Sequence, residues 1–191
     1  MKVVAFNGSP HKDGNTSILI NHVLGELKNE GIETEVVQVG GKKIRGCIAC
    51  YKCMENLNQR CAVDNDILNE CIGRLLDADG ILLASPVYFT DVTAEMKALI
   101  DRVGMVGTAN GYMYKRKVGA AVAAVRRAGS IHTLDTMNHL LTYHQMIIPG
   151  SSYWNMGIGM MPGEVEKDEE GIQIMRTLGQ NMAWVLKKLY G

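Results

Sequence analysis

The 191-residue sequence has no apolar run long enough to cross a bilayer and no excess of charge of either sign. Lys and Arg together number 20, as do Asp and Glu, so the formal net charge is zero. Proteins that bind nucleic acid in general need a cationic surface, which this composition disfavours. We therefore expect neither a membrane protein nor a nucleic-acid-binding protein.

A secretory signal is missing as well. The chain passes from Met1 directly into the apolar run Val3–Phe6, without the charged, apolar and small-residue regions of a signal peptide. The expected location is therefore the cytoplasm. Structural disulfides are rare there, so the five cysteines need another explanation.

Several motifs of known mechanism are also absent. There is no G-x-x-x-x-G-K-S/T loop for a triphosphate, no G-x-G-x-x-G loop for a dinucleotide and no H-E-x-x-H metal motif. Nothing indicates a Ser–His–Asp triad. His132, His139 and His144 are interpreted as ordinary residues of one helix, whereas His11 lies in a polar loop and is a candidate phosphate contact.

The chain does contain a regular alternation of strand and helix patterns. Apolar residues at helical spacing predict helices around residues 20–27, 67–76, 96–103, 130–143 and 178–189. Strands that alternate with helices predict an α/β protein with helices on both faces of a parallel sheet. We expect one domain over residues 1–191, a flavodoxin-like three-layer sandwich with strand order 2-1-3-4-5. The predicted strands are Val3–Phe6, Thr34–Val39, Gly80–Ala84, Lys117–Val125 and Met146–Ile148.

Residues that favour helix ends lie at the expected boundaries. Gly31 follows the first predicted helix, where glycine commonly ends helices. Asp91 or Thr93 can cap the helix after the third strand, and Ser130 can cap the next one.

The first strand is followed by 7-NGSPHKDGNTS-17, a loop of small and polar residues. Gly8 and Gly14 let the backbone approach a ligand closely, and N–H groups at a helix start carry partial positive charge. Such a loop suits a single phosphate, as in a nucleotide or flavin mononucleotide. An ordinary turn capped by Asn15 or Thr16 uses the same residue types, so this alternative stays open.

Two further loops should lie at the same edge of the sheet, because the carboxyl ends of parallel strands meet there. The loop 85-SPVYFT-90 offers flat rings and free backbone groups to a heterocycle. The loop 126-RRAGS-130 offers two arginines to an anion. Each alone could be rim packing or solvated surface, but their joint placement predicts a ligand site.

The segments 4-VAFNGSPHKDGNTS-17 and 85-SPVYFTDVTAEMKALIDR-102 together resemble the NADPH-dependent FMN reductase family of flavodoxin-like proteins. The resemblance implies FMN as cofactor, NAD(P)H as reductant, and a homodimer or homotetramer with the flavin near a subunit interface. By its place, the loop 151–163 is also expected to approach the flavin. Together with His11, the expected FMN-site residues are Ser9, Asn15, Thr16, Ser17, Pro86, Val87, Tyr88, Phe89, Arg126, Arg127, Ala128 and Gly129.

Four cysteines follow the second strand, in an insertion of about residues 40–63. They are Cys47, Cys50, Cys53 and Cys61, separated by two, two and seven residues. Four thiolates suit zinc or an iron–sulfur cluster, and this spacing favours a cubane cluster because structural zinc more often uses two separated pairs. Reactive thiols without metal remain an alternative.

This cysteine pattern resembles that of the iron–sulfur flavoproteins, a branch of the same family. The resemblance implies a 4Fe-4S cluster on those four cysteines, near the flavin. Cys71 lies on an apolar helix face and is expected to be a buried structural thiol.

The function expected from these features is that of an FMN-dependent oxidoreductase. A reduced nicotinamide would reduce the flavin, which would pass electrons to a quinone-like or other small acceptor, to a redox protein, or to the cluster. This chemistry requires no side chain as acid or nucleophile, so no catalytic residue is assigned. The alternatives are a non-enzymatic flavin electron carrier and a cysteine-based metal or redox sensor.

Overall fold

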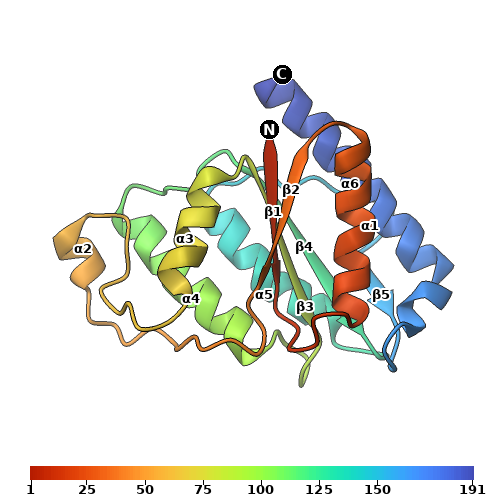
Figure 1. Ribbon diagram of the computed structural model, residues 1–191, viewed down its shortest axis with the longest axis horizontal. Coiled ribbons are helices and arrows are strands. Elements are labelled where there is room, and N and C mark those ends of the chain that lie inside the picture. Colours follow the sequence, from red (N-terminus) through yellow and green to blue (C-terminus); the bar gives the residue numbers. More distant parts are fainter.

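A computed structural model describes residues 1–191 as one five-stranded parallel sheet between two layers of helices (Figure 1). The strand order is β2-β1-β3-β4-β5, which confirms the predicted flavodoxin-like topology. Each central strand is a continuous apolar run, as expected where both faces of a sheet are covered. The strands are β1 (Lys2–Asn7), β2 (Glu33–Gln38), β3 (Gly80–Pro86), β4 (Val118–Val125) and β5 (Met156–Ile158).

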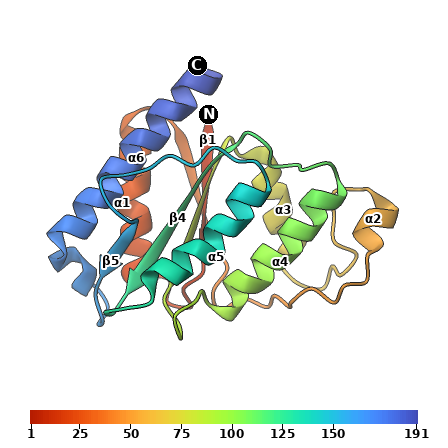
Figure 2. The ribbon, with the colours of Figure 1, turned by 180° about the vertical axis from the view of Figure 1, so that it is seen from behind.

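Helices cover both faces of this sheet, with α1 and α6 on one face and α3, α4 and α5 on the other, as Figures 1 and 2 show. None of them combines the length and apolar character that a bilayer-spanning helix needs. A short helix within the cysteine segment was not predicted. The helices are α1 (Asn15–Asn29), α2 (Lys52–Asn56), α3 (Leu68–Asp77), α4 (Ala94–Ala109), α5 (Ser130–Tyr143) and α6 (Glu169–Tyr190), with a 3-10 turn at Glu164–Lys167.

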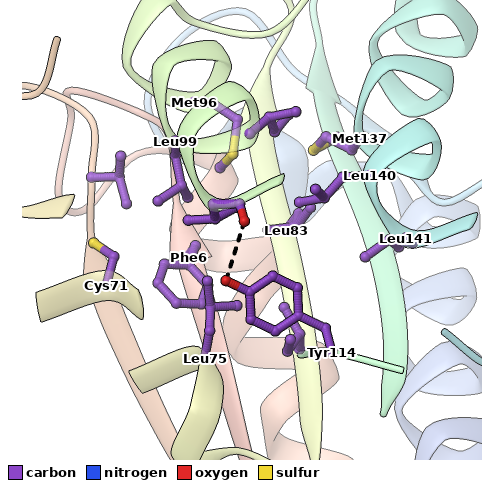
Figure 3. Packing of buried hydrophobic residues seen from close by; sticks show 14 of the residues in the cluster. Phe6, Cys71, Leu75, Leu83, Met96, Leu99, Tyr114, Met137, Leu140 and Leu141 are labelled. Carbon is purple, nitrogen blue, oxygen red and sulfur yellow. Dashed lines mark hydrogen bonds between the residues drawn. The ribbon is translucent and has the colours of Figure 1, made fainter. Parts of the chain in front are cut away.

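Each face of the sheet has its own hydrophobic core. On one face, α1 and α6 pack against the small side chains of β4, which is buried along its whole length. On the other, Phe6 and Leu83 pack against Leu99 and Tyr114 beneath α3, α4 and α5 (Figure 3). Burial of apolar area at about 25 cal/mol per Å² is the main stabilising contribution of both cores.

The fifth strand lies ten residues beyond its predicted place, so the prediction of Met146–Ile148 is wrong. Ile147 does begin to pair with β4, since its N–H donates to the carbonyl of Lys117 at 3.0 Å. Pro149 follows two residues later and has no N–H with which to continue the ladder. The chain therefore leaves the sheet, and β5 pairs instead with residues 123–125 at the carboxyl end of β4.

The helix starts also test the predicted caps. Thr93 caps α4, because its side chain accepts from the amide of Met96 at 3.3 Å. The prediction for Ser130 is wrong: Gly129 occupies the cap position, with φ of 92°, and the Ser130 hydroxyl contacts the sulfur of Met156 at 2.9 Å. Only a glycine adopts this backbone conformation without strain.

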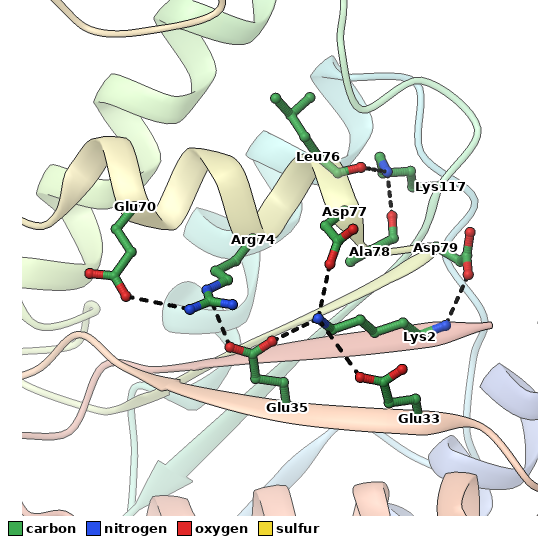
Figure 4. A network of polar contacts seen from close by, with 10 residues as sticks. All are labelled: Lys2, Glu33, Glu35, Glu70, Arg74, Leu76, Asp77, Ala78, Asp79 and Lys117. Carbon is green, nitrogen blue, oxygen red and sulfur yellow. Dashed lines mark hydrogen bonds and ion pairs between the residues drawn. The ribbon is translucent and has the colours of Figure 1, made fainter.

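Charged side chains gather at the amino end of the sheet, opposite the loops of interest (Figure 4). The ammonium of Lys2 lies 2.9 Å from carboxylates of both Glu35 and Asp77, and Arg74 lies 3.3 Å from Glu35. These pairs join β1, β2 and α3 and are explained by the fold alone. A ligand site is therefore sought at the carboxyl end of the sheet.

Helices α4 and α5 meet at His144, which is fully buried. Its Nε2 lies 3.1 Å from the carbonyl of Gly104, and a Cβ at Gly107 would lie 2.6 Å from its ring. Burial lowers the pKa of His144 from 6.5, and the Gly104 carbonyl offsets this only in part. Folded protein therefore holds a neutral imidazole at a pH where the unfolded chain is protonated.

This burial predicts a pH dependence of stability. Between the two pKa values the unfolded state binds more protons, so the stability present above pH 6.5 is lost as the pH falls below it. We expect His144→Gln to have a flatter profile of urea midpoint against pH than the wild type. His139→Gln, an exposed site on the same helix, is the control, and equal slopes for His144→Gln and the wild type would contradict the prediction.

Candidate functional site

The carboxyl ends of β1, β3, β4 and β5 surround one cavity of about 260 Å³. The three loops that were predicted to converge do so, and the loop after β5 closes a fourth side. The lining residues are Ser9, His11, Gly14, Asn15, Thr16, Pro86, Val87, Tyr88, Ala124, Arg126, Gly159, Met160 and Pro162.

The loop after β1 presents donors to this cavity. The first helical hydrogen bond of α1 runs from the amide of Ile18 to the carbonyl of Gly14, so the amides of Asn15, Thr16 and Ser17 precede it. Gly14 occupies the cap position, and no side chain caps the helix. The alternative of a turn capped by Asn15 or Thr16 is therefore wrong.

Thr16 differs from its polar neighbours in having no hydrogen-bond partner for its side chain. It is 1% exposed and lines the cavity. Ser9 also lines it, and its oxygen accepts from the amide of His11 at 3.1 Å, which leaves its own proton to donate. Because the Thr16 side chain lines the cavity and makes no hydrogen bond within the protein, its hydroxyl is suited to meet a ligand oxygen.

Asn15 and Ser17 have a different local role. The Asn15 amide donates to the carbonyls of Gly159 and Met161 at 3.1 and 3.0 Å, and so holds the loop after β5. The Ser17 hydroxyl donates to the carbonyl of Lys12 and lies outside the cavity lining. Contact of these two side chains with phosphate stays a prediction.

The loop after β3 places Pro86, Val87 and Tyr88 along one wall of the cavity. Its tip is a tight turn in which the next two residues, Phe89 and Thr90, both have positive φ. The Phe89 ring is fully exposed and outside the cavity lining. Its contact with a flavin stays a prediction.

The loop after β4 contributes Arg126 to the lining, whereas Arg127 and Ala128 are exposed outside it. Gly129 lies where this loop packs against the loop after β3. A Cβ there would lie 2.9 Å from Thr90, so glycine lets this loop pack against the loop after β3. Arg126 is the one cation that the strand ends bring to the cavity.

Sequence reasoning missed three lining residues that follow β5, namely Gly159, Met160 and Pro162. The prediction that residues 151–163 approach the site did not single them out. The glycine at position 159 could have indicated a close backbone approach. A Cβ there would lie 2.6 Å from the amide nitrogen of Val165, so only glycine fits at this position.

The four predicted metal-ligating cysteines also share one cavity, of about 20 Å³, against α4. Ala49 and Tyr51 have positive φ, and these turns bring Cys50 and Cys53 to the same side. Cys47 and Cys50 are exposed, Cys61 is half-buried and Cys53 is buried. Burial raises the pKa of Cys53, and charge on the nearby Cys61 adds to this.

No three of these side chains are already gathered about a single metal-ion position. A cubane cluster holds its cysteine sulfurs farther apart than one tetrahedral ion does, so the four cysteines need not converge on one point to hold a cluster. The cavity must widen to hold a cluster, and the two exposed cysteines have the freedom to turn. Four sulfurs in an apolar lining are donors of the type that iron–sulfur clusters use.

Arg102 of α4 lines the same cavity and is paired with Asp66 at 2.5 Å. Burial tends to raise the pKa of Asp66, but bonds from the Arg102 guanidinium and from the amides of Arg45 and Leu68 outweigh it and hold the pKa low. Both groups of the pair are therefore charged at neutral pH.

Cys71 lies apart from this cavity, on the face of α3 that packs into the core. Its side chain is 1% exposed, and burial raises the pKa of the thiol to about 12. The prediction of a buried structural thiol is confirmed.

The fold and the strand-end cavity define a flavodoxin-like protein. The chain belongs to the NADPH-dependent FMN reductase family, whose model matches residues 1–160. This confirms the resemblance from the sequence and with it the family's cofactor class, flavin.

The similarity to known proteins covers nearly the whole chain. An iron-sulfur flavoprotein of Methanocaldococcus jannaschii is 36% identical over 194 residues, 98% of each chain. One of Methanosarcina thermophila is 32% identical over 189 residues, 98% of this chain and 96% of that protein. The structure of RosB with the bound intermediate 8-demethyl-8-formylriboflavin-5'-phosphate has a TM-score of 0.76 at 20% identity, covering 99% of this chain and 80% of RosB, and shows the shared fold.

Proposed function

We propose that this protein is an FMN-dependent oxidoreductase that takes electrons from NAD(P)H and delivers them to a small acceptor, such as a quinone, or to a redox protein. A 4Fe-4S cluster on Cys47, Cys50, Cys53 and Cys61 serves as a second redox centre. The observation that carries the proposal is the strand-end cavity, which Ser9 and Thr16 line beside the first amides of α1.

Different residues bind different parts of the cofactor. The hydroxyls of Ser9 and Thr16 and the first amides of α1 bind the phosphate. Pro86 and Tyr88 flank the ring, and Arg126 supplies positive charge at the cavity rim. When bound, FMN supplies the ability to accept two electrons together and release them singly.

The cysteine site lies farther along the same helix. We call the loop of residues 7–17 the phosphate loop. The Thr93 hydroxyl at the start of α4 donates to the carbonyl of Gly8 in this loop at 2.8 Å. Arg102 beside the cysteines comes nine residues later, about 13 Å along the helix axis. The names of the iron-sulfur flavoprotein relatives support a cluster in this protein.

We also propose that the protein assembles as a homodimer or homotetramer. Exposed apolar side chains favour such a contact: Met160 lines the cavity, Phe89 follows the lining residue Tyr88, and Tyr153 and Trp154 lie in the segment before β5. Sedimentation velocity tests it, and a monomer at micromolar concentration would exclude it.

The main test is anaerobic purification followed by mixing with NADPH or NADH in a stopped-flow spectrometer. Bound flavin should bleach within the turnover time of a working reductase. Flavin that binds but is bleached by neither nucleotide would reduce the proposal to an electron carrier. Failure of the apoprotein to bind FMN at micromolar concentration would reject it entirely.

Thr16→Val tests the phosphate contact at nearly constant volume. A hydrogen bond to a charged group contributes about 1.5–3 kcal/mol, so we expect FMN binding to weaken about tenfold to a hundredfold. Titration of flavin fluorescence measures the change. Thr177→Val, a half-buried helix position on α6 outside the cavity lining, is the matched control and should bind as the wild type does. Equal affinity in both variants would remove Thr16 from the site.

A further inference from the structure

A single arginine side chain contacts the cysteine site from inside the protein. Arg102 is 2% exposed, and its Nη2 donates to the sulfur of Cys61 at 3.4 Å. We propose that Arg102 is a positioning residue that raises the reduction potential of the cluster through this N–H to sulfur bond. The inference rests on the proposed cluster and goes beyond it by assigning control of its potential to one residue.

The guanidinium is held in place on every side. It donates to the Asp66 carboxylate at 2.5 Å and to the carbonyls of Arg45 and Val63 at 3.1 and 2.8 Å, as well as to Cys61. Arg45 precedes the first cysteine and Val63 follows the last, so one side chain fixes both ends of the cysteine segment. A planar fork with several donors can do this, and a lysine ammonium cannot reach the same set.

The pairing with Asp66 decides which effect acts on the cluster. The Asp66 side chain is 1% exposed, so a positive and a negative charge are buried together and nearly cancel. What remains is the directed N–H to the Cys61 sulfur. Such a bond draws negative charge from the sulfur, stabilises the more negative reduced state and raises the potential.

The redox step itself is simple. One electron passes to the cluster from the reduced flavin of the proposed function, no bond forms or breaks, and Arg102 keeps its protons. Lowering the cluster potential would therefore make this transfer less favourable without altering the flavin site.

The experiment is a potentiometric titration of anaerobic holoprotein followed by electron paramagnetic resonance. The key variant is the double substitution Arg102→Met with Asp66→Asn, because it removes the N–H while keeping the net charge of the pair at zero and leaving no lone buried carboxylate. We expect the equilibrium constant for cluster reduction to fall about tenfold, a shift of about 59 mV for one electron. The band for stretching between iron and cysteine sulfur should move to higher frequency in resonance Raman spectra.

Three further variants separate this effect from charge and from folding. Asp66→Asn alone keeps the Arg102 donor and removes negative charge, so its potential should not fall below that of the wild type. Arg102→Lys keeps the charge with a poorer donor geometry and should lie between the wild type and the double variant. Arg45→Met removes an exposed cation near the cysteines without removing the N–H, and should leave the potential within a small, salt-screened shift.

The outcomes are distinct. A double variant with less iron but an unmoved potential in its loaded fraction means that Arg102 is only structural, and overturns the inference alone. If the double variant does not fold, Arg102→Lys with a wild-type potential overturns it equally. Wild-type protein without iron and acid-labile sulfide overturns the cluster itself, and the inference falls with it.

Discussion

Replacing Gly40 by alanine should abolish tight FMN binding, although residue 40 does not line the cavity. A Cβ at this position would lie 2.2 and 2.3 Å from the carbonyl carbon and oxygen of Ser9 and 2.4 Å from the oxygen of Gly8. These are backbone atoms, so the phosphate loop itself must move. Loss of two phosphate bonds at about 1.5–3 kcal/mol each predicts binding weakened a hundredfold or more.

The contact of Gly40 is part of a clamp on the phosphate loop. The amide of Gly40 donates to the carbonyl of Asn7 at 3.0 Å, and the Gln38 side chain donates to the carbonyls of Ser9 and Gly40. The end of β2 therefore fixes the loop that follows β1. We expect Gly40→Ala to lose about 1–3 kcal/mol of stability as well, as for other overpacked sites.

Gly25→Ala is the matched control for this substitution. A Cβ at Gly25 in α1 meets nothing within 4 Å, and alanine favours the helix by about 0.5–1 kcal/mol. Fluorescence titration measures FMN affinity, and urea unfolding measures stability. Both should fall in Gly40→Ala, whereas Gly25→Ala should be more stable than the wild type and bind FMN with unchanged affinity. Unchanged FMN binding by Gly40→Ala would mean that the loop between Asn7 and Ser17 does not hold the cofactor.

The convergence of three loops could be predicted from the sequence because parallel topology alone brings the strand ends together. The roles of single residues within a loop could not. Asn15 and Ser17 have the same chemistry as Thr16, yet hydrogen bonds to backbone carbonyls already occupy their side chains. For Asn15 the partner, Gly159, lies 144 residues away in sequence, beyond the reach of any local pattern.

The fifth strand and the buried arginine show the same limit. Met146–Ile148 is more apolar than the segment that forms β5. Its hydrogen bonding to β4 stops because Pro149 has no N–H to donate, and β5 pairs with the carboxyl end of β4 instead. Arg102 on a helix is most simply read as solvated. Its burial follows from Asp66 and from carbonyls on both sides of the cysteine segment, which only the folded chain brings together.

Replacing Cys53 by alanine should remove the cluster and leave the flavin. Cys53 is the buried member of the four, and it lines the same cavity as Cys50 and Cys61. Even changes to the partners of metal ligands cost tenfold or more in metal affinity, and loss of a ligand should exceed this. Iron and sulfide per chain should fall more than about tenfold, while FMN content stays that of the wild type.

Cys71→Ala is the matched control, because it removes another buried thiol that lies outside the cysteine cavity. It should cost about 1 kcal/mol of packing free energy and keep both cofactors. Iron retained by Cys53→Ala would show that the four cysteines do not act as one ligand set. Loss of FMN together with iron in Cys53→Ala would mean that the cysteine segment is needed to form the flavin cavity, against the geometry in which no cysteine lines that cavity. Separate loss is expected because the two sites contact different parts of α4, with the phosphate loop at its first turn and the cysteines near its middle.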